Sequence, residues 1–125
     1  MILDTNAVSA LAENDANLIA KLPRDRPWYL PVVVIGEFRF GIAGSRYAER
    51  LEAWLSQLIS VVPVLEIKES TANHYARVRQ QMKRDNRKIP PNDSWIAALA
   101  LEHSQPILTR DTDFGAIEGV AVIRW

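Results

Sequence analysis

The sequence predicts an α/β fold with a largely parallel sheet, and three observations lead to this prediction. Short apolar runs of strand character alternate with helix-like segments along the chain. Such alternation is typical of parallel sheets covered by helices. The 125 residues, 48% hydrophobic and 24% charged, contain no internal repeat or linker, which suits one domain spanning residues 1–125.

Five short apolar runs are expected to form the strands. They lie at residues 2–3, 28–32, 61–65, 107–109 and 120–123. Helix-like segments separate each run from the next, so neighbouring strands can lie parallel with a helix crossing between them.

The helices are predicted from the spacing of apolar residues and from caps. Asp4 or Thr5 can cap a helix that begins near Ala7. Residues 47–59 place apolar side chains at i, i+4, i+7 and i+8, which indicates a helix with one buried stripe. A narrower stripe predicts a helix over residues 68–84.

Two further segments complete the pattern. Residues 95–101 are apolar all round, which predicts a helix buried between layers, with Asn92 as its N-cap because Pro90 and Pro91 precede it. The segment VVVIGEF at 32–38 is compatible with a strand, because its residues are branched, and with a helix through Glu37.

Composition excludes several classes of protein. The chain has no cysteine, which excludes disulfides, thiolate metal sites and thiol chemistry and fits a reducing cytoplasm. We expect no secretion signal and no membrane span, since no apolar run approaches the ~20 residues of a bilayer helix. The net charge is zero, so contact with a nucleic acid has to depend on local charge.

Four acids occur where a strand ends or where a neighbouring segment begins. Asp4 follows the first strand, Asp111 follows the fourth, Asp93 opens the apolar helix and Glu37 lies within VVVIGEFRF. Ligands of open α/β sheets bind at the carboxyl ends of the strands. Capping, turn formation or solvent exposure can explain each acid alone. These explanations leave their shared placement unexplained.

The segments MILDTN, VVVIGEFRFGI, NDSWIAALAL and ILTRDTDF resemble, in this order, the motifs of the PIN-domain ribonucleases, and most of all those of VapC-type toxins of bacterial toxin–antitoxin pairs. The resemblance covers nearly the whole chain. It implies a three-layer α/β/α sandwich with a central, mostly parallel sheet and an acidic pocket at its carboxyl edge. The catalytic acids of that pocket would be Asp4, Glu37, Asp93 and Asp111. Smaller or outer polar residues that position carboxylates or contact phosphate would be Asn6, Thr109 and Asp113, and Asp113 is also an alternative to Asp111 as the fourth pocket acid.

A pocket with four acids has to be partly protonated or hold a cation. Two carboxylates ~5 Å apart repel by about 3 kcal/mol at an effective dielectric constant of ~20, so six pairs approach ~20 kcal/mol. A typical domain is stable by only about 5 to 15 kcal/mol. Hard oxygen ligands favour Mg²⁺ or Mn²⁺, and we expect Asp4, Asp93 and Asp111 to bind one or two such ions. The expected reaction is metal-assisted hydrolysis of RNA, in which Glu37 orients or deprotonates a water or completes the metal shell.

Positive charge is concentrated just before the Asp93 motif. These cations can hold an RNA backbone, although a solvated helix face explains them as well. They are Arg77, Arg79, Lys83, Arg84, Arg87 and Lys88, with Asp85 as the single acid among them. The resemblance also implies a toxin that inhibits translation or growth, a cognate small antitoxin protein and a homodimer.

Two other functions fit parts of the sequence. A non-catalytic PIN-like module would bind RNA or a protein, although none of the four expected acids is missing. An aspartate-based phosphotransfer enzyme would place acids at strand ends as well. The haloacid-dehalogenase pattern, however, requires a second acid where Asn6 stands, and a receiver domain requires a lysine that ILTRD lacks.

Overall fold

The sheet of the computed structural model, which describes residues 1–125, consists of five parallel strands of two residues each. They are β1 (Ile2–Leu3), β2 (Leu30–Pro31), β3 (Val64–Leu65), β4 (Ile107–Leu108) and β5 (Val122–Ile123). β1 pairs with β4, with Ile2 opposite Ile107, and β4 pairs with β5, while β2 pairs with β3. A parallel bridge between Ile2 and Tyr29, the residue before β2, joins the sheet of β1, β4 and β5 to the pair β2 and β3, which gives the order β3-β2-β1-β4-β5. The predicted parallel sheet is confirmed.

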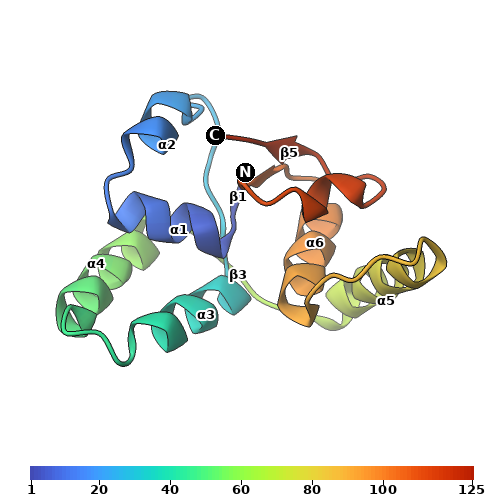
Figure 1. Ribbon diagram of the computed structural model, residues 1–125, viewed down its shortest axis with the longest axis horizontal. Helices are drawn as coiled ribbons and strands as arrows, with labels where there is room; N and C mark the ends of the chain where they lie inside the picture. The colour runs from blue at the N-terminus through green and yellow to red at the C-terminus, as the bar shows by residue number, and fades with distance from the viewer.

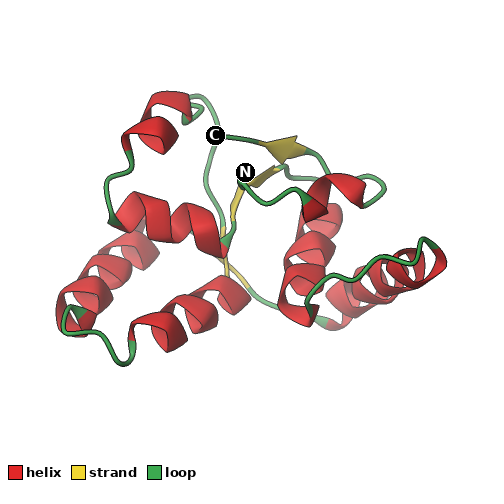
Figure 2. Cartoon of the chain, in the orientation of Figure 1, coloured by secondary structure: helices red, strands yellow, loops and turns green.

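Helices cover both sides of these strands, which gives the three-layer α/β/α arrangement. α1 to α4 lie on the left of the central strands in Figure 1, and α5 and α6 lie on the right. Figure 2 shows how short the strands are beside the helices. The helices are α1 (Thr5–Ala12), α2 (Ala16–Lys21), α3 (Val32–Ile42), α4 (Ala48–Val61), α5 (Glu69–Arg84) and α6 (Pro91–His103), followed by the 3-10 helix η1 (Asp113–Ala116).

The core lies around β1, β4 and α6. All four residues of β1 and β4 are completely buried, and each such apolar side chain contributes roughly 1.5–3 kcal/mol by leaving water. In α6, five consecutive residues from Ile96 to Ala100 are buried, which confirms a helix enclosed between layers. α6 packs along α5 and also touches α3. No helix of the protein is both long and apolar enough to cross a membrane.

The ambiguous segment VVVIGEF is helical. It forms most of α3, which begins directly after Pro31, so the predicted strand at 28–32 shortens to β2. Helix formation there is favoured by the side chains of Val34, Ile35 and Phe38, which share one buried face at helical spacing. The strand expected at 61–65 also shortens, because Val61 ends α4 and is 78% exposed.

The predicted cap of α6 is wrong. The helix begins at Pro91 rather than after Asn92, and Pro90 occupies the N-cap position without a side-chain hydrogen bond. A proline is well suited to the first helical position, where its missing N–H would have had no partner within the helix. α2 and η1 were not predicted, because each is short and buries a single side chain, Leu18 or Phe114.

Candidate active site

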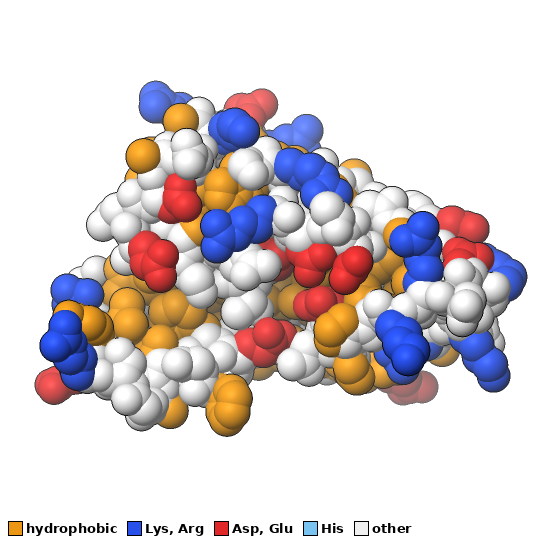
Figure 3. Space-filling view, viewed as in Figure 1, with side chains coloured by type: hydrophobic (Ala, Val, Ile, Leu, Met, Phe, Trp, Pro, Cys, Tyr) orange, Lys and Arg blue, Asp and Glu red, His pale blue; other side chains and the backbone are white.

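The strand order brings two carboxyl ends together at the centre of the sheet. β1 and β4 are parallel neighbours, so Asp4 after β1 and Thr109 after β4 lie at the same edge. The next strand in the chain, β2, lies on one side of β1, and β4 lies on the other side. Such a switch in strand order is where open α/β sheets bind ligands. In Figure 3 acidic side chains gather near the middle of the face, between the two groups of helices.

Asp4 is both a helix cap and a member of this edge. It is 3% exposed, and its Oδ1 accepts a hydrogen bond of 2.7 Å from the backbone N–H of Ala7. The pKa of Asp4 is raised to about 6, mainly by burial and also by the charge of Asp111, while hydrogen bonds from Thr109 and Ala7 oppose the change. Asp4 therefore caps α1 and also belongs to the group of acids at this edge.

Asp93 lies in the first turn of α6 and is partly buried. Burial raises the pKa of Asp93 to about 6, and four other acids raise it as well, in the order Asp111, Glu37, Asp4 and Asp113. All four pocket acids suggested by the resemblance therefore lie close enough together for their charges to interact. Asp113 belongs to its outer part, because its effect on Asp93 is the smallest of the four and its side chain is exposed.

The loop after β4 is organised by Thr109. This residue is completely buried, and its hydroxyl accepts a hydrogen bond of 2.9 Å from the backbone N–H of Asp111 while also bonding to Asp4. Oδ1 of Asp111 in turn accepts a hydrogen bond of 2.9 Å from the backbone N–H of Asp113. Thr109 thus links the acids that follow two neighbouring strands.

Glu37 reaches the edge from α3. Its Oε2 accepts a hydrogen bond of 3.1 Å from the hydroxyl of Thr5, whereas its Oε1 is buried without any partner. Glu37 also borders a largely apolar groove of about 450 Å³ between α1, α3 and α4. Asn6, in contrast, is exposed on the first turn of α1.

The donor set fits a hard divalent cation. The acids carry only oxygen donors, they repel one another around Asp93, and Glu37 Oε1 is a buried acceptor with nothing bound to it. In this structure no group of three or more acidic or histidine side chains is placed so that it could hold a metal ion. Mg²⁺ does not need such a group, since it is commonly bound through one or two carboxylates and keeps several waters.

Comparison with known proteins identifies the family. The family model described as the PIN domain matches residues 1–120. The chain belongs to the PIN-domain family. Ribonuclease VapC5 of Mycobacterium tuberculosis is 32% identical over 124 residues, which cover 98% of this PIN domain and 90% of the relative. Ribonuclease VapC4 of the same organism is 36% identical over 98 residues, covering 77% and 75%.

A solved structure has the same fold as this PIN domain. The crystal structure of VapBC-5 from M. tuberculosis, described as a member of the VapBC family of toxin-antitoxin systems, matches with a TM-score of 0.79 and 28% sequence identity. The match covers 99% of the PIN domain and 97% of the other chain. The predicted resemblance to the VapC-type group is thereby confirmed.

The six predicted RNA-binding cations lie on α5 and in the loop that follows it, and all are exposed. Two of them have partners within the PIN domain. Arg79 donates a hydrogen bond of 3.0 Å to the carbonyl of Ile89, and Arg84 forms ion pairs with Glu118 at 3.4 Å and Asp85 at 3.6 Å. The cations without such partners are Arg77, Lys83, Arg87 and Lys88.

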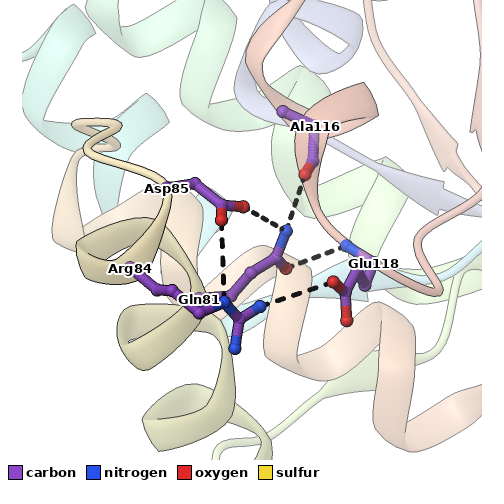
Figure 4. A network of polar contacts seen from close by, with 5 residues as sticks. All are labelled: Gln81, Arg84, Asp85, Ala116 and Glu118. Carbon is purple, nitrogen blue, oxygen red and sulfur yellow. Dashed lines mark hydrogen bonds and ion pairs between the residues drawn. The ribbon is translucent and has the colours of Figure 1, made fainter.

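Sequence reasoning missed two residues of this region. Thr5 was considered only as a cap, but its hydroxyl bonds to Glu37 in a different helix. Gln81 is a buried amide that binds the end of η1, as Figure 4 shows. Its Nε2 donates a hydrogen bond of 2.9 Å to the carbonyl of Ala116 and one of 3.1 Å to the carboxylate of Asp85. A buried polar residue on the apolar face of α5 was the available clue, but its partners are far away in the sequence.

Proposed function

We propose that this PIN domain is a cytoplasmic, Mg²⁺- or Mn²⁺-dependent endoribonuclease and the toxin of a toxin–antitoxin pair. The proposal depends on one observation, the interaction between the charges of four acids near the carboxyl ends of β1 and β4. These acids are Asp4, Glu37, Asp93 and Asp111. The names of the VapC ribonucleases support the reaction, and the toxin–antitoxin structure supports the biological role.

The ion would be held by Asp4, Asp93 and Asp111, which offer oxygen donors from three separate segments. When bound, Mg²⁺ or Mn²⁺ would lower the pKa of a coordinated water and neutralise charge on the phosphate. The ion would also relieve the repulsion between acids, which adds to burial in raising the pKa of Asp4 and Asp93.

The remaining polar residues would act on the water and on the carboxylates. Glu37 would orient or deprotonate the water that attacks phosphorus, or complete the metal shell. The new oxygen–phosphorus bond forms as the bond to the leaving RNA oxygen breaks. Thr109 would keep Asp4 and the Asp111 loop in place, while exposed Asn6 and Asp113 would contact the substrate or the outer hydration shell.

The site also suits the proposed partners. An acidic pocket attracts a basic segment, and the apolar groove beside Glu37 offers that segment a surface on which to pack. A cognate antitoxin that covers the pocket would keep the ribonuclease inactive, and its loss would let RNA cleavage inhibit translation or growth. A homodimer is part of the same proposal.

The test is cleavage of single-stranded and structured RNAs by purified protein free of antitoxin, with Mg²⁺ or Mn²⁺. We expect cleavage that chelator abolishes and that Asp4→Asn and Asp93→Asn abolish. Asp15→Asn is the matched control, because Asp15 caps α2 through its side chain but does not belong to the acidic cluster. Cleavage that persists in chelator would contradict the metal, and folded wild-type protein that cuts no RNA would favour the non-catalytic module instead.

A further inference from the structure

The hydroxyl of Thr5 is the only side-chain partner of Glu37. Thr5 is the first residue of α1, directly after Asp4. Its Oγ1 donates a hydrogen bond of 3.1 Å to Oε2 of Glu37 in α3. A glutamate has three rotatable side-chain bonds and loses considerable entropy when it is held in one orientation. This hydrogen bond between two packed helices therefore decides how the Glu37 carboxylate lies.

The two oxygens of Glu37 have different surroundings as a result. Oε2 is occupied by Thr5, whereas Oε1 is buried and has no donor. A buried carboxylate oxygen without a donor is costly, so it is retained where something else binds to it. Glu37 is also close enough to Asp93 for their charges to repel, which places the carboxylate at the acidic cluster.

We propose that Thr5 is a positioning residue, whose hydroxyl binds Oε2 of Glu37 and so fixes the orientation in which this carboxylate acts in the proposed reaction. This inference rests on the proposed ribonuclease function and adds a residue to its machinery. In the step, the water O–H bond breaks and its proton goes to the Glu37 carboxylate. An oxygen–phosphorus bond forms while the bond from phosphorus to the leaving RNA oxygen breaks, and that oxygen takes a proton from solvent. Thr5 itself touches neither substrate nor proton and acts through Glu37 alone.

The first measurement compares kcat and KM for RNA cleavage by three variants. Thr5→Val removes the hydroxyl but keeps a branched side chain of similar volume, and Thr5→Ser keeps the hydroxyl. Ser9→Ala is the matched control, because Ser9 carries a hydroxyl on the same helix and borders the same groove. We expect Thr5→Val to lower kcat on the order of tenfold with KM unchanged. Thr5→Ser should recover most of the kcat that Thr5→Val loses, and Ser9→Ala should keep the wild-type kcat.

The second measurement does not depend on catalysis. Urea unfolding of wild-type protein, Thr5→Val, Glu37→Ala and the double variant forms a double-mutant cycle. We expect the two substitutions to be non-additive, with Thr5→Val having less effect on stability once Glu37 is absent. Full additivity would show that the hydroxyl does not act on Glu37 and would overturn the inference.

The remaining outcomes separate this inference from the proposed function. Wild-type kcat in Thr5→Val, or a raised KM with unchanged kcat, overturns the role of Thr5 while leaving the ribonuclease intact. A folded wild-type protein that cuts no RNA overturns the proposed function and this role with it. If Thr5→Val fails to fold, Thr5→Ala replaces it, and equal kcat values for Thr5→Ala and Thr5→Ser overturn the inference.

Discussion

The backbone N–H of Glu118 donates a hydrogen bond of 2.9 Å to the side chain of Gln81, 37 residues earlier in the chain. The same amide donates to the carbonyl of Ala116, so one side chain of α5 satisfies an acceptor at the end of η1 and a donor just after it. The segment around Ala116 and Glu118 continues the loop that carries Asp111 and Asp113. Gln81 therefore fixes the end of α5 against the C-terminal part of the acidic edge.

Substitution of Gln81 by alanine should lower the free energy of unfolding by about 1–3 kcal/mol, because the backbone groups of Ala116 and Glu118 lose their partner. Urea denaturation monitored by circular dichroism measures this change. Gln80→Ala is the control, since Gln80 is exposed on the same helix. Equal stabilities for the two variants would mean that water replaces the Gln81 contacts without loss.

Asp4→Asn should stabilise the protein at pH 8 in the presence of chelator. The folded-state pKa of Asp4 is raised to about 6 from 3.8, so folding favours the protonated acid. This contribution is fully present below the unfolded pKa and is lost as pH rises through about 6. Asparagine keeps the N-cap and carries no charge, so we expect a gain of about 1–3 kcal/mol at pH 8.

The same comparison at pH 4 provides the internal check of this prediction. Asp4 is then protonated in the folded protein, and the difference between Asp4→Asn and wild type should largely vanish. Asp15→Asn should show no such pH dependence if the effect belongs to the acidic edge. Thermal or urea unfolding at both pH values measures the difference in stability between Asp4→Asn and wild type. A gain in stability that does not depend on pH would point to a cause other than the charge of Asp4.

Thr109→Val should impair cleavage by about 10- to 100-fold, because the buried hydroxyl that joins Asp4 to the Asp111 loop is removed. Thr109→Ser keeps the hydroxyl and should retain most activity. Thr112→Val is a control on an exposed threonine of the same loop. Steady-state kcat on one RNA substrate distinguishes the three variants, and wild-type kcat in Thr109→Val would remove Thr109 from the site.

Neutralising Lys83, Arg87 and Lys88 with glutamine should weaken RNA binding and reduce its salt dependence. The slope of log K against log salt should fall by about one unit for each phosphate contact that is lost. Binding is measured with the Asp93→Asn protein, so that RNA is not cleaved. Arg46 and Arg50 serve as controls, because both pack over the ring of Tyr47. An equal change of slope in both sets would indicate general attraction rather than a defined RNA path.

The sequence predicted the layers well because they depend on local patterns. The apolar runs at 2–3 and 107–109 and the stripe over 47–59 correspond to β1, β4 and α4. Boundaries were harder to predict where two preferences compete. At 32–38 the branched residues favoured a strand, but burial of one helical face decided for α3. At Pro91 the backbone chemistry of the first helical position outweighed the usual view of proline as a helix breaker.

The predicted candidate site contained its acids and the polar residues Asn6 and Thr109, but not Thr5 or Gln81. Asp4, Asp93 and Asp111 could be found because they stand at the ends of predicted elements. Thr5 and Gln81 could not, because their roles depend on partners in other elements, Glu37 in α3 and the segment after η1. Such contacts follow from the packing of helices, which a single sequence without an alignment does not specify.

The pairing of β1 with β4 determines when the protein becomes active during its own folding. Asp4 and Thr109 meet only after residues near the two ends of the chain have come together, and closing so large a loop is slow and costs much chain entropy. A partly synthesised or truncated chain would contain Asp4, Glu37 and Asp93 without an assembled edge. A polypeptide of this kind would be harmless to RNA until its last strands are in place.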